Sequence, residues 1–333
     1  MGIFLSSLAV VAALLQAPPP PAAAPADSLG PWRARLLRDS GDAEAWSQLG
    51  LGLLHLSDAY HEHHGASGDT SWARAILDTA DYAFTRVATL RAGSASSDSA
   101  RALRVFAWAD RALLDWELNG VEAATHEWKV MPADLKLAPV LEELGENLLR
   151  ACPREGVLLT AGPPGTVSTW FLQFARGLRP DLLIVPLTLW ETDSLFRARV
   201  IRENHLASPR SQRLSATEDP WIEHFARFRP VCAPTGFDRP PERRPAVKWT
   251  PHPLMWVAGG SARRRSAGGE GGDAVTEVPA QDFVFAALKL ALDANDPWAR
   301  TVLGVYRRAA GISPELCDAM TAFEIPKDKV GCP

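Results

Sequence analysis

Residues 154–190 constrain the fold of this chain most, because their pattern is that of two strands joined by a helix. The apolar run at 156–160 is soon followed by Gly-Pro-Pro-Gly. We expect that segment to form a tight loop, because proline cannot donate a ladder hydrogen bond. A helix capped by Thr166 or Ser168 should follow. The apolar run at 182–189 is typical of a parallel strand covered on both faces, so the sequence predicts a βαβ unit.

Paired helices are predicted before this unit. Trp46, Leu49 and Leu53 share one face at helical spacing, and Ala80 and Phe84 have the spacing of a second helix. This pattern resembles a tetratricopeptide repeat, although the two halves are separated by more residues than in a standard repeat. The predicted fold class is therefore α/β, a parallel sheet with covering helices, preceded by a tetratricopeptide-like α-helical region.

The chain is expected to begin with an export signal. Residues 3–15 are almost entirely apolar but too short for a membrane-spanning helix of about 20 residues, and Ala24-Pro25-Ala26 offers an A-x-A cleavage site. We expect a periplasmic or secreted protein. Because no Lys or Arg precedes Trp32, an uncleaved leader that tethers the protein to the membrane is the alternative.

The predicted organisation has five segments. They are a signal peptide at 1–26, tetratricopeptide-like helices at 27–138, an α/β domain at 139–260, a flexible loop at 261–278 and C-terminal helices at 279–333 that pack on the α/β domain. Further elements are expected as helices at 192–203, 221–228, 283–292 and 297–311, the last capped by Asp296, and as strands at 230–233 and 254–257.

The four cysteines suit an oxidising compartment and allow three pairings. Cys317 and Cys332 are close in sequence and could staple the C-terminal tail. Cys152 and Cys232 could meet across the sheet. We take this pairing as a hypothesis.

Composition argues against a nucleic-acid partner. The 333 residues carry a net charge of -4, and the only tight basic run is Arg263 to Arg265. A broad positive surface is therefore not predicted.

The segment Gly162 to Thr169 aligns with the P-loop pattern G-x-x-x-x-G-K-[ST] but lacks essential parts of it. Val167 replaces the second glycine, and Ser168 replaces the lysine that contacts the β- and γ-phosphates. A degenerate P-loop nucleotide-binding protein is therefore the less favoured alternative, and weak anion binding at the helix N-terminus stays open.

The same region resembles a family of uncharacterised bacterial envelope proteins. Members are often fused to a membrane domain similar to protein O-mannosyltransferases and often carry tetratricopeptide repeats. Their soluble part has the run G-D-x-D-T-x-x-x-W-Y-L-Q, then G-x-R-x-D-V and an apolar strand ending N-L-S-L. The matching residues are Gly162, Thr166, Trp170, Phe171, Leu172, Gln173, Gly177, Arg179, Asp181, Leu187, Thr188 and Leu189.

This resemblance implies an envelope location and an α/β fold, but it implies no particular activity. Pro163 and Gly165 stand where the family has two aspartates, so a ligand held by those carboxylates is not held in the same way here.

No metal, cofactor or catalytic residue is predicted. His55, Asp58 and Glu62 share a helical stripe, but that stripe points away from the apolar face and is better explained as a solvated surface. There is no G-x-S-x-G motif. Arg179 and Asp181 flank a turn, where a structural ion pair is favoured over a catalytic role.

We expect any ligand site at the carboxyl ends of the parallel strands. Its predicted residues are Thr166, Ser168, Thr169, Trp170, Gln173, Arg179, Asp181, Trp190, Glu191 and Asp193. Trp190 and Trp249 could line a groove for a glycan or peptide.

The resulting functional hypothesis is an exported, non-catalytic binding or assembly module of the bacterial cell envelope, with a protein or peptide partner in the helical region. The alternative is an envelope glycan-related transferase or hydrolase. Convergence of Glu191, Asp193 and His252 in one pocket would favour that enzyme.

Overall fold

A computed structural model describes residues 28–64, 70–204, 221–235, 247–259 and 278–332. The chain divides into two compact units, residues 1–136 and 137–333. The predicted signal peptide, and the predicted flexible loop except for its last residue, lie outside the described residues. Within the described ranges, no helix combines the length and hydrophobicity needed to cross a bilayer.

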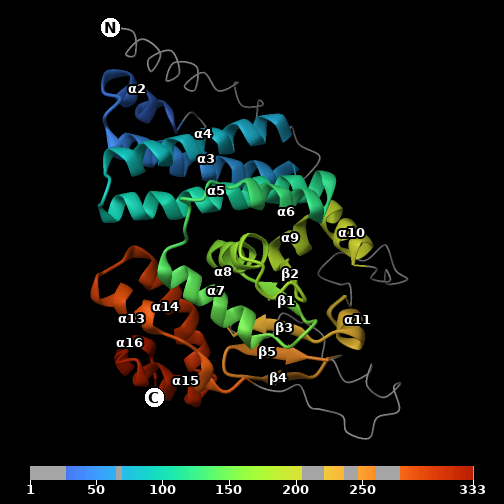
Figure 1. Ribbon diagram of the computed structural model, residues 1–333. Coiled ribbons are helices and arrows are strands. Elements are labelled where there is room, and N and C mark those ends of the chain that lie inside the picture. The colour runs from blue at the N-terminus through green and yellow to red at the C-terminus, as the bar shows by residue number, and fades with distance from the viewer. Residues whose placement is uncertain (1–27, 65–69, 205–220, 236–246, 260–277, 333) are drawn as a thin grey trace, which may run out of the picture. The chain divides into compact units, whose positions relative to one another are not determined.

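The first unit consists of helices that each pack on the next one along the chain (Figure 1). They are α2 (Gly30–Arg38), α3 (Ala43–His64), α4 (Thr70–Leu90), α5 (Ala95–Asn119) and α6 (Val121–Val130). Helix α2 was not predicted. Asp42 caps α3 as expected, because its carboxylate accepts from the Ala45 N–H at 2.9 Å.

The apolar faces of α3 and α4 are those that the sequence predicts. Trp46, Leu49 and Leu53 are buried, and so are Ala80 and Phe84. Some of the additional residues that were predicted between the two helices belong to α3, which ends at His64. The helical pair spans residues 43–90, more than the 34 residues of a standard repeat. The helical pair is observed, while its identity as a tetratricopeptide repeat stays a prediction.

The second unit contains a five-stranded sheet and its surrounding helices. In chain order its elements are α7 (Pro139–Ala151), β1 (Val157–Thr160), α8 (Gly162–Trp170), the π-helix η2 (Phe171–Ala175), β2 (Leu183–Pro186), α9 (Leu187–Thr192), α10 (Ser194–Glu203), α11 (Trp221–Phe228), β3 (Val231–Pro234), β4 (Trp249–Pro251), β5 (Met255–Ala258), the 3₁₀ helix η3 (Ala280–Asp282), α13 (Ala286–Asp293), α14 (Pro297–Ala310), α15 (Pro314–Ala322) and α16 (Lys327–Val330).

The strand order is β2-β1-β3-β5-β4. Strand β1 pairs in parallel with β2, in the register Val157 with Leu183, and also in parallel with β3. The predicted βαβ unit is therefore confirmed. The prediction of a parallel sheet is wrong for the other half, because β5 runs antiparallel to both β3 and β4. A short turn joins β4 to β5, and antiparallel strands need no helical crossover.

The helix after β1 starts earlier than predicted. The Gly-Pro-Pro-Gly segment forms the first turn of α8 instead of a separate loop, and Thr166 and Ser168 lie inside the helix instead of capping it. Proline is compatible with a first helical turn, where backbone N–H groups have no intrahelical partner. Gly162 makes the entry into the helix with φ +69°, a conformation that favours glycine.

The second strand is shorter than predicted. Strand β2 ends at Pro186, which cannot donate to the ladder, and α9 takes up the rest of the predicted strand. A continuous apolar run has no period that separates a buried strand from a buried helix. Trp190 and Glu191 therefore lie in a helix and not in a loop.

Both hypothesised disulfides are present. Cys152 at the end of α7 is bonded to Cys232 in β3, and Cys317 in α15 is bonded to Cys332. Asp296 caps α14 as predicted, since its carboxylate accepts from the Trp298 N–H at 2.8 Å.

Candidate functional site

The predicted site residues lie at two different ends of the sheet. A βαβ crossover runs from the carboxyl end of one strand to the amino end of the next. Helix α8 and η2 span residues 162–175, which separates their ends by about 20 Å. Thr166 is therefore at the carboxyl end of β1, whereas Arg179 and Asp181 precede β2 at its amino end.

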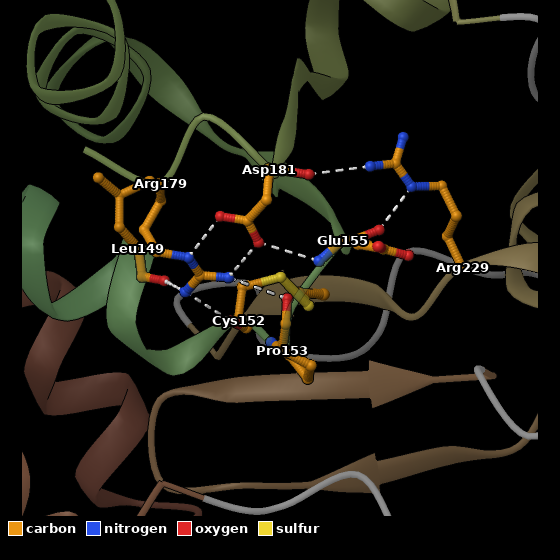
Figure 2. The surroundings of a disulfide bond; sticks show 8 residues. Leu149, Cys152, Pro153, Glu155, Arg179, Asp181 and Arg229 are labelled. Carbon is orange, nitrogen blue, oxygen red and sulfur yellow. Dashed lines mark hydrogen bonds and ion pairs between the residues drawn. A yellow bond between two sulfur atoms is a disulfide. The ribbon is translucent and has the colours of Figure 1, made fainter. Parts of the chain in front are cut away.

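Arg179 is committed to internal contacts at the amino end (Figure 2). Its Nη1 donates to the carbonyl oxygens of Leu149 and Cys152 at 2.6 and 3.0 Å, and its Nη2 donates to that of Pro153 at 3.2 Å. Its Nε and Nη2 also donate to the two carboxylate oxygens of Asp181, both at 2.9 Å. These five hydrogen bonds match the five N–H donors of a guanidinium group, so none remains for a ligand.

Asp181, two residues before β2, belongs to the same network. The Arg179 guanidinium lowers the pKa of the Asp181 carboxyl to about 2, and the Glu155 N–H, which donates to it at 3.0 Å, contributes in the same direction. Arg229 donates to the carbonyl oxygens of Glu155 and Asp181 (Figure 2). The network therefore holds three turns at the amino end of the sheet.

Gln173 belongs to this end as well. It lies in η2, and its side-chain amide donates to the carbonyl oxygens of Arg179 and Leu182 at 2.8 and 2.9 Å. A π-helical turn adds a residue to the ordinary helical repeat and so changes the direction of the side chains that follow. Gln173 thereby fixes the turn into β2. We refer to Gln173, Arg179, Asp181 and Arg229 as the amino-end network.

The carboxyl end of β1 has hydroxyl groups in place of charges. The Thr160 and Thr166 hydroxyl oxygens are 2.8 Å apart and share a hydrogen bond. Thr235, directly after β3, donates its hydroxyl to the Leu254 carbonyl oxygen at 3.0 Å. Strands β2 and β3 flank β1 on opposite sides, so this is the point where the strand order reverses and where open α/β sheets usually bind ligands. We call Thr160, Thr166 and Thr235 the hydroxyl cluster; Thr160 and Thr235 are buried, and Thr166 is half-buried.

An anion is a poor fit to this end of α8. Helix N-termini bind anions through free backbone N–H groups, and Pro163 and Pro164 remove two of these donors from the first turn. Together with the missing P-loop lysine, this weighs against phosphate binding here. A neutral hydroxyl or amide group suits this end better, because the half-buried Thr166 hydroxyl can both donate and accept.

Three further predicted residues lie inside the fold. Ser168 and Thr169 are fully buried, and Ser168 lies where α8 passes closest to Gly145 of α7. Thr169 donates its hydroxyl to the Gly165 carbonyl oxygen at 2.8 Å. Trp170 is also buried, with its ring edge-on to Phe174. Their positions are those of packing residues.

The residues predicted after β2 also have structural contacts. Trp190 is buried against the rings of Trp221 and Phe225, with centroids 4.6 and 5.3 Å away, so it does not line a groove. Asp193 caps α10 by accepting from the Phe196 N–H at 3.0 Å. Glu191 is exposed at the surface of α9.

Glu191 and Asp193 follow a strand that lies far from His252 in the sheet. They follow β2 at one edge of the sheet, whereas His252 lies between β4 and β5. Because β1 and β3 stand between β2 and β5, those two strands are about 14 Å apart at the usual strand spacing. In the described part of the chain, no group of three or more His, Cys, Asp or Glu side chains has the arrangement of a metal site.

The sequence reading missed a polar stripe on α7. Glu143 accepts from the N–H groups of Ala287 and Leu288 at 2.7 and 2.9 Å and so caps α13, and burial raises the pKa of its carboxyl. Asn147 bonds both backbone groups of Val284. Arg150 donates to a carbonyl of η3. The spacing i, i+4, i+7 on an apolar helix was a signal that these residues share one face.

Charged residues also connect helices of the first unit. Arg111 in α5 bonds Asp78 of α4 at 2.8 Å and Glu127 of α6 at 2.7 Å. Arg104 bonds Asp81 of α4 at 2.8 Å. Since these side chains are largely paired with one another, they fit a role in helix packing.

Comparison of the chain with protein-family models, curated proteins and solved structures found no match.

Proposed function

We propose that the protein is an exported, non-catalytic binding or assembly module of the bacterial cell envelope, with its ligand surface around the half-buried Thr166 at the carboxyl end of β1. One observation carries the proposal: three of the four charged side chains expected at the site, Arg179, Asp181 and Asp193, serve internal roles in the amino-end network and as a helix cap, and the fourth, Glu191, is exposed on α9. General acid–base or nucleophilic catalysis needs such groups to be available to a substrate.

Two disulfides support the export part of the proposal. They use all four cysteines of the chain. Disulfides of this kind persist mainly in oxidising compartments. The resemblance of residues 162–189 to envelope proteins points to the same location.

The ligand class that fits best is a neutral polar one, such as a peptide backbone or the hydroxyl groups of a glycan. The half-buried Thr166 hydroxyl offers a donor and an acceptor without charge, and the two prolines of α8 disfavour an anion. A protein or peptide partner in the helical unit stays part of the proposal.

Export is tested by fractionating cells that produce the full chain and labelling free thiols before and after reduction. We expect the chain in the periplasm or medium, with four thiols that react only after reduction. Recovery in the cytosol with four reactive thiols would contradict export.

Binding is tested by comparing two bulky substitutions at opposite ends of one helical segment. Thr166→Trp adds bulk at the hydroxyl cluster, whereas Arg176→Trp adds it at the exposed far end. We expect the first to lose envelope components that co-purify with the wild type and the second to keep them. Equal recovery with both variants would place the binding surface elsewhere.

A further inference from the structure

The two disulfides close loops of very different lengths. Cys317 and Cys332 are 15 residues apart, and Cys152 and Cys232 are 80 apart. In a flexible chain the frequency of loop closure falls as about the 3/2 power of loop length, so the shorter loop closes about 12-fold more often. The disulfide between Cys317 and Cys332 can therefore form with little contribution from the folded structure.

The long-range pair is different, because Cys232 has a competing partner at nearly the same distance. Cys317 follows Cys232 by 85 residues, from the numbering of the chain. Loops of 80 and 85 residues differ in closure frequency by about a tenth. Chain statistics therefore do not decide which of Cys152 and Cys317 reacts with Cys232, so structure near the cysteines must decide.

Hydrogen bonds from the Arg179 side chain hold the segment that contains Cys152. This guanidinium bonds the carbonyl oxygens of Leu149, Cys152 and Pro153, which are the last turn of α7 and the start of the next turn (Figure 2). These bonds set where α7 ends, and they place Cys152 before β1 begins.

Cys232 is held by the same network. Arg229, three residues before Cys232, donates to the carbonyl oxygens of Glu155 and Asp181. Nearby, the Val157 N–H donates to the Pro230 carbonyl oxygen at 2.8 Å, and Cys232 is in register with Leu158 of β1. The amino-end network thus aligns the segments that carry both cysteines.

We propose that Arg179 is a positioning residue that selects Cys152 as the disulfide partner of Cys232 during oxidative folding. One of the two thiolates attacks a low-molecular-weight disulfide such as oxidised glutathione and releases one glutathione thiol. The other thiolate then attacks the mixed disulfide and releases the second. Two protein thiols are oxidised, and one glutathione disulfide is reduced to two thiols.

The test uses a full chain in which Cys332→Ser leaves Cys317 as a direct competitor. The reduced, denatured chain is refolded in a mixture of reduced and oxidised glutathione, free thiols are alkylated, and the linked peptides are counted by mass spectrometry. With Arg179 present, we expect the Cys152–Cys232 product to predominate over the Cys232–Cys317 product. With Arg179→Met, the ratio should fall severalfold and approach about one, the value set by loop length.

Two controls separate pairing selection from general loss of stability. Arg176→Met removes a neighbouring arginine that lies over the Phe171 ring and outside the network. Leu148→Ala removes buried packing from α7 without removing a network bond. Both controls should keep the predominance of the Cys152–Cys232 product. An unchanged ratio in Arg179→Met, or an equal fall in Leu148→Ala, would overturn the proposal.

Discussion

The contact between α7 and α8 gives a sharp test of the packing around the βαβ unit. A Cβ atom added to Gly145 would lie 2.8 Å from Leu172 Cδ1 and 3.0 Å from the backbone carbonyl carbon of Ser168. Distances this short require a neighbour to move. The second contact involves backbone inside a helix, which cannot move as a side chain can. We therefore expect Gly145→Ala to strain this helix pair.

The magnitude follows from comparison with a second helical glycine. A Cβ atom added to Gly304 in α14 has no neighbour within 4 Å. Alanine is favoured over glycine inside a helix by about 1 kcal/mol at both positions. Overpacking costs about 1–3 kcal/mol. Because the helix-propensity gain is common to both variants, their difference in unfolding free energy isolates the overpacking cost, about 1–3 kcal/mol.

Urea unfolding read by hydrogen exchange and mass spectrometry measures this difference in the full chain, because peptides from residues 137–333 report their own unit. Gly304→Ala should raise the transition midpoint of these peptides, and Gly145→Ala should lower it relative to Gly304→Ala. Equal stabilisation by both substitutions would refute the close approach of α7 and α8.

Three other perturbations have defined outcomes. Asp181→Asn should flatten the acid dependence of the unfolding free energy, measured by circular dichroism. The pKa of Asp181 is lowered from 3.8 to about 2 in the folded protein. The ionised carboxylate therefore stabilises the fold above pH 3.8, and this stabilisation is lost as the pH falls towards 2. Identical acid transitions would contradict this. Asn147→Leu removes the side-chain partner of the exposed Val284 backbone groups, which water can replace, and of the buried Tyr306 hydroxyl oxygen, which it cannot; leaving that buried oxygen without its partner should cost about 1–3 kcal/mol in urea unfolding. An unchanged unfolding free energy would argue against the contact. Replacing both Cys317 and Cys332 with serine should cost about 3 kcal/mol by opening a 15-residue loop. The loss of amide protection should centre on α15 and α16, and unchanged protection there would count against a stapling role.

Local patterns predicted much of the fold. The helix at 221–228 has the predicted bounds, and the cap at Asp296 and both disulfides were expected from residue type and spacing. Strand direction was not accessible in the same way. The residues of β5 are apolar whether the strand runs parallel or antiparallel. The short turn between β4 and β5 explains why these two strands are antiparallel, but the apolar pattern does not specify the direction of β5 relative to β3.

The candidate site shows a different limit. Thr166 and Arg179 are close in sequence, and the sequence reading placed them in one site. A helix between two parallel strands must carry the chain from one end of the sheet to the other, so the two residues cannot meet. The prediction that an ion pair fixes the turn at Arg179 and Asp181 agrees with the observed bonds. The partners Leu149, Pro153 and Arg229 could not be predicted, because they come from distant parts of the chain.

The central claim is that the amino end of the sheet is occupied by structural bonds and that the carboxyl end is the binding surface. The most direct measurement places a photoreactive amino acid at position 166 or at position 176 of the full chain and cross-links each variant in intact envelopes. We predict a discrete cross-linked product from position 166 and none from position 176. Products from position 176 alone, or from neither position, would contradict the claim.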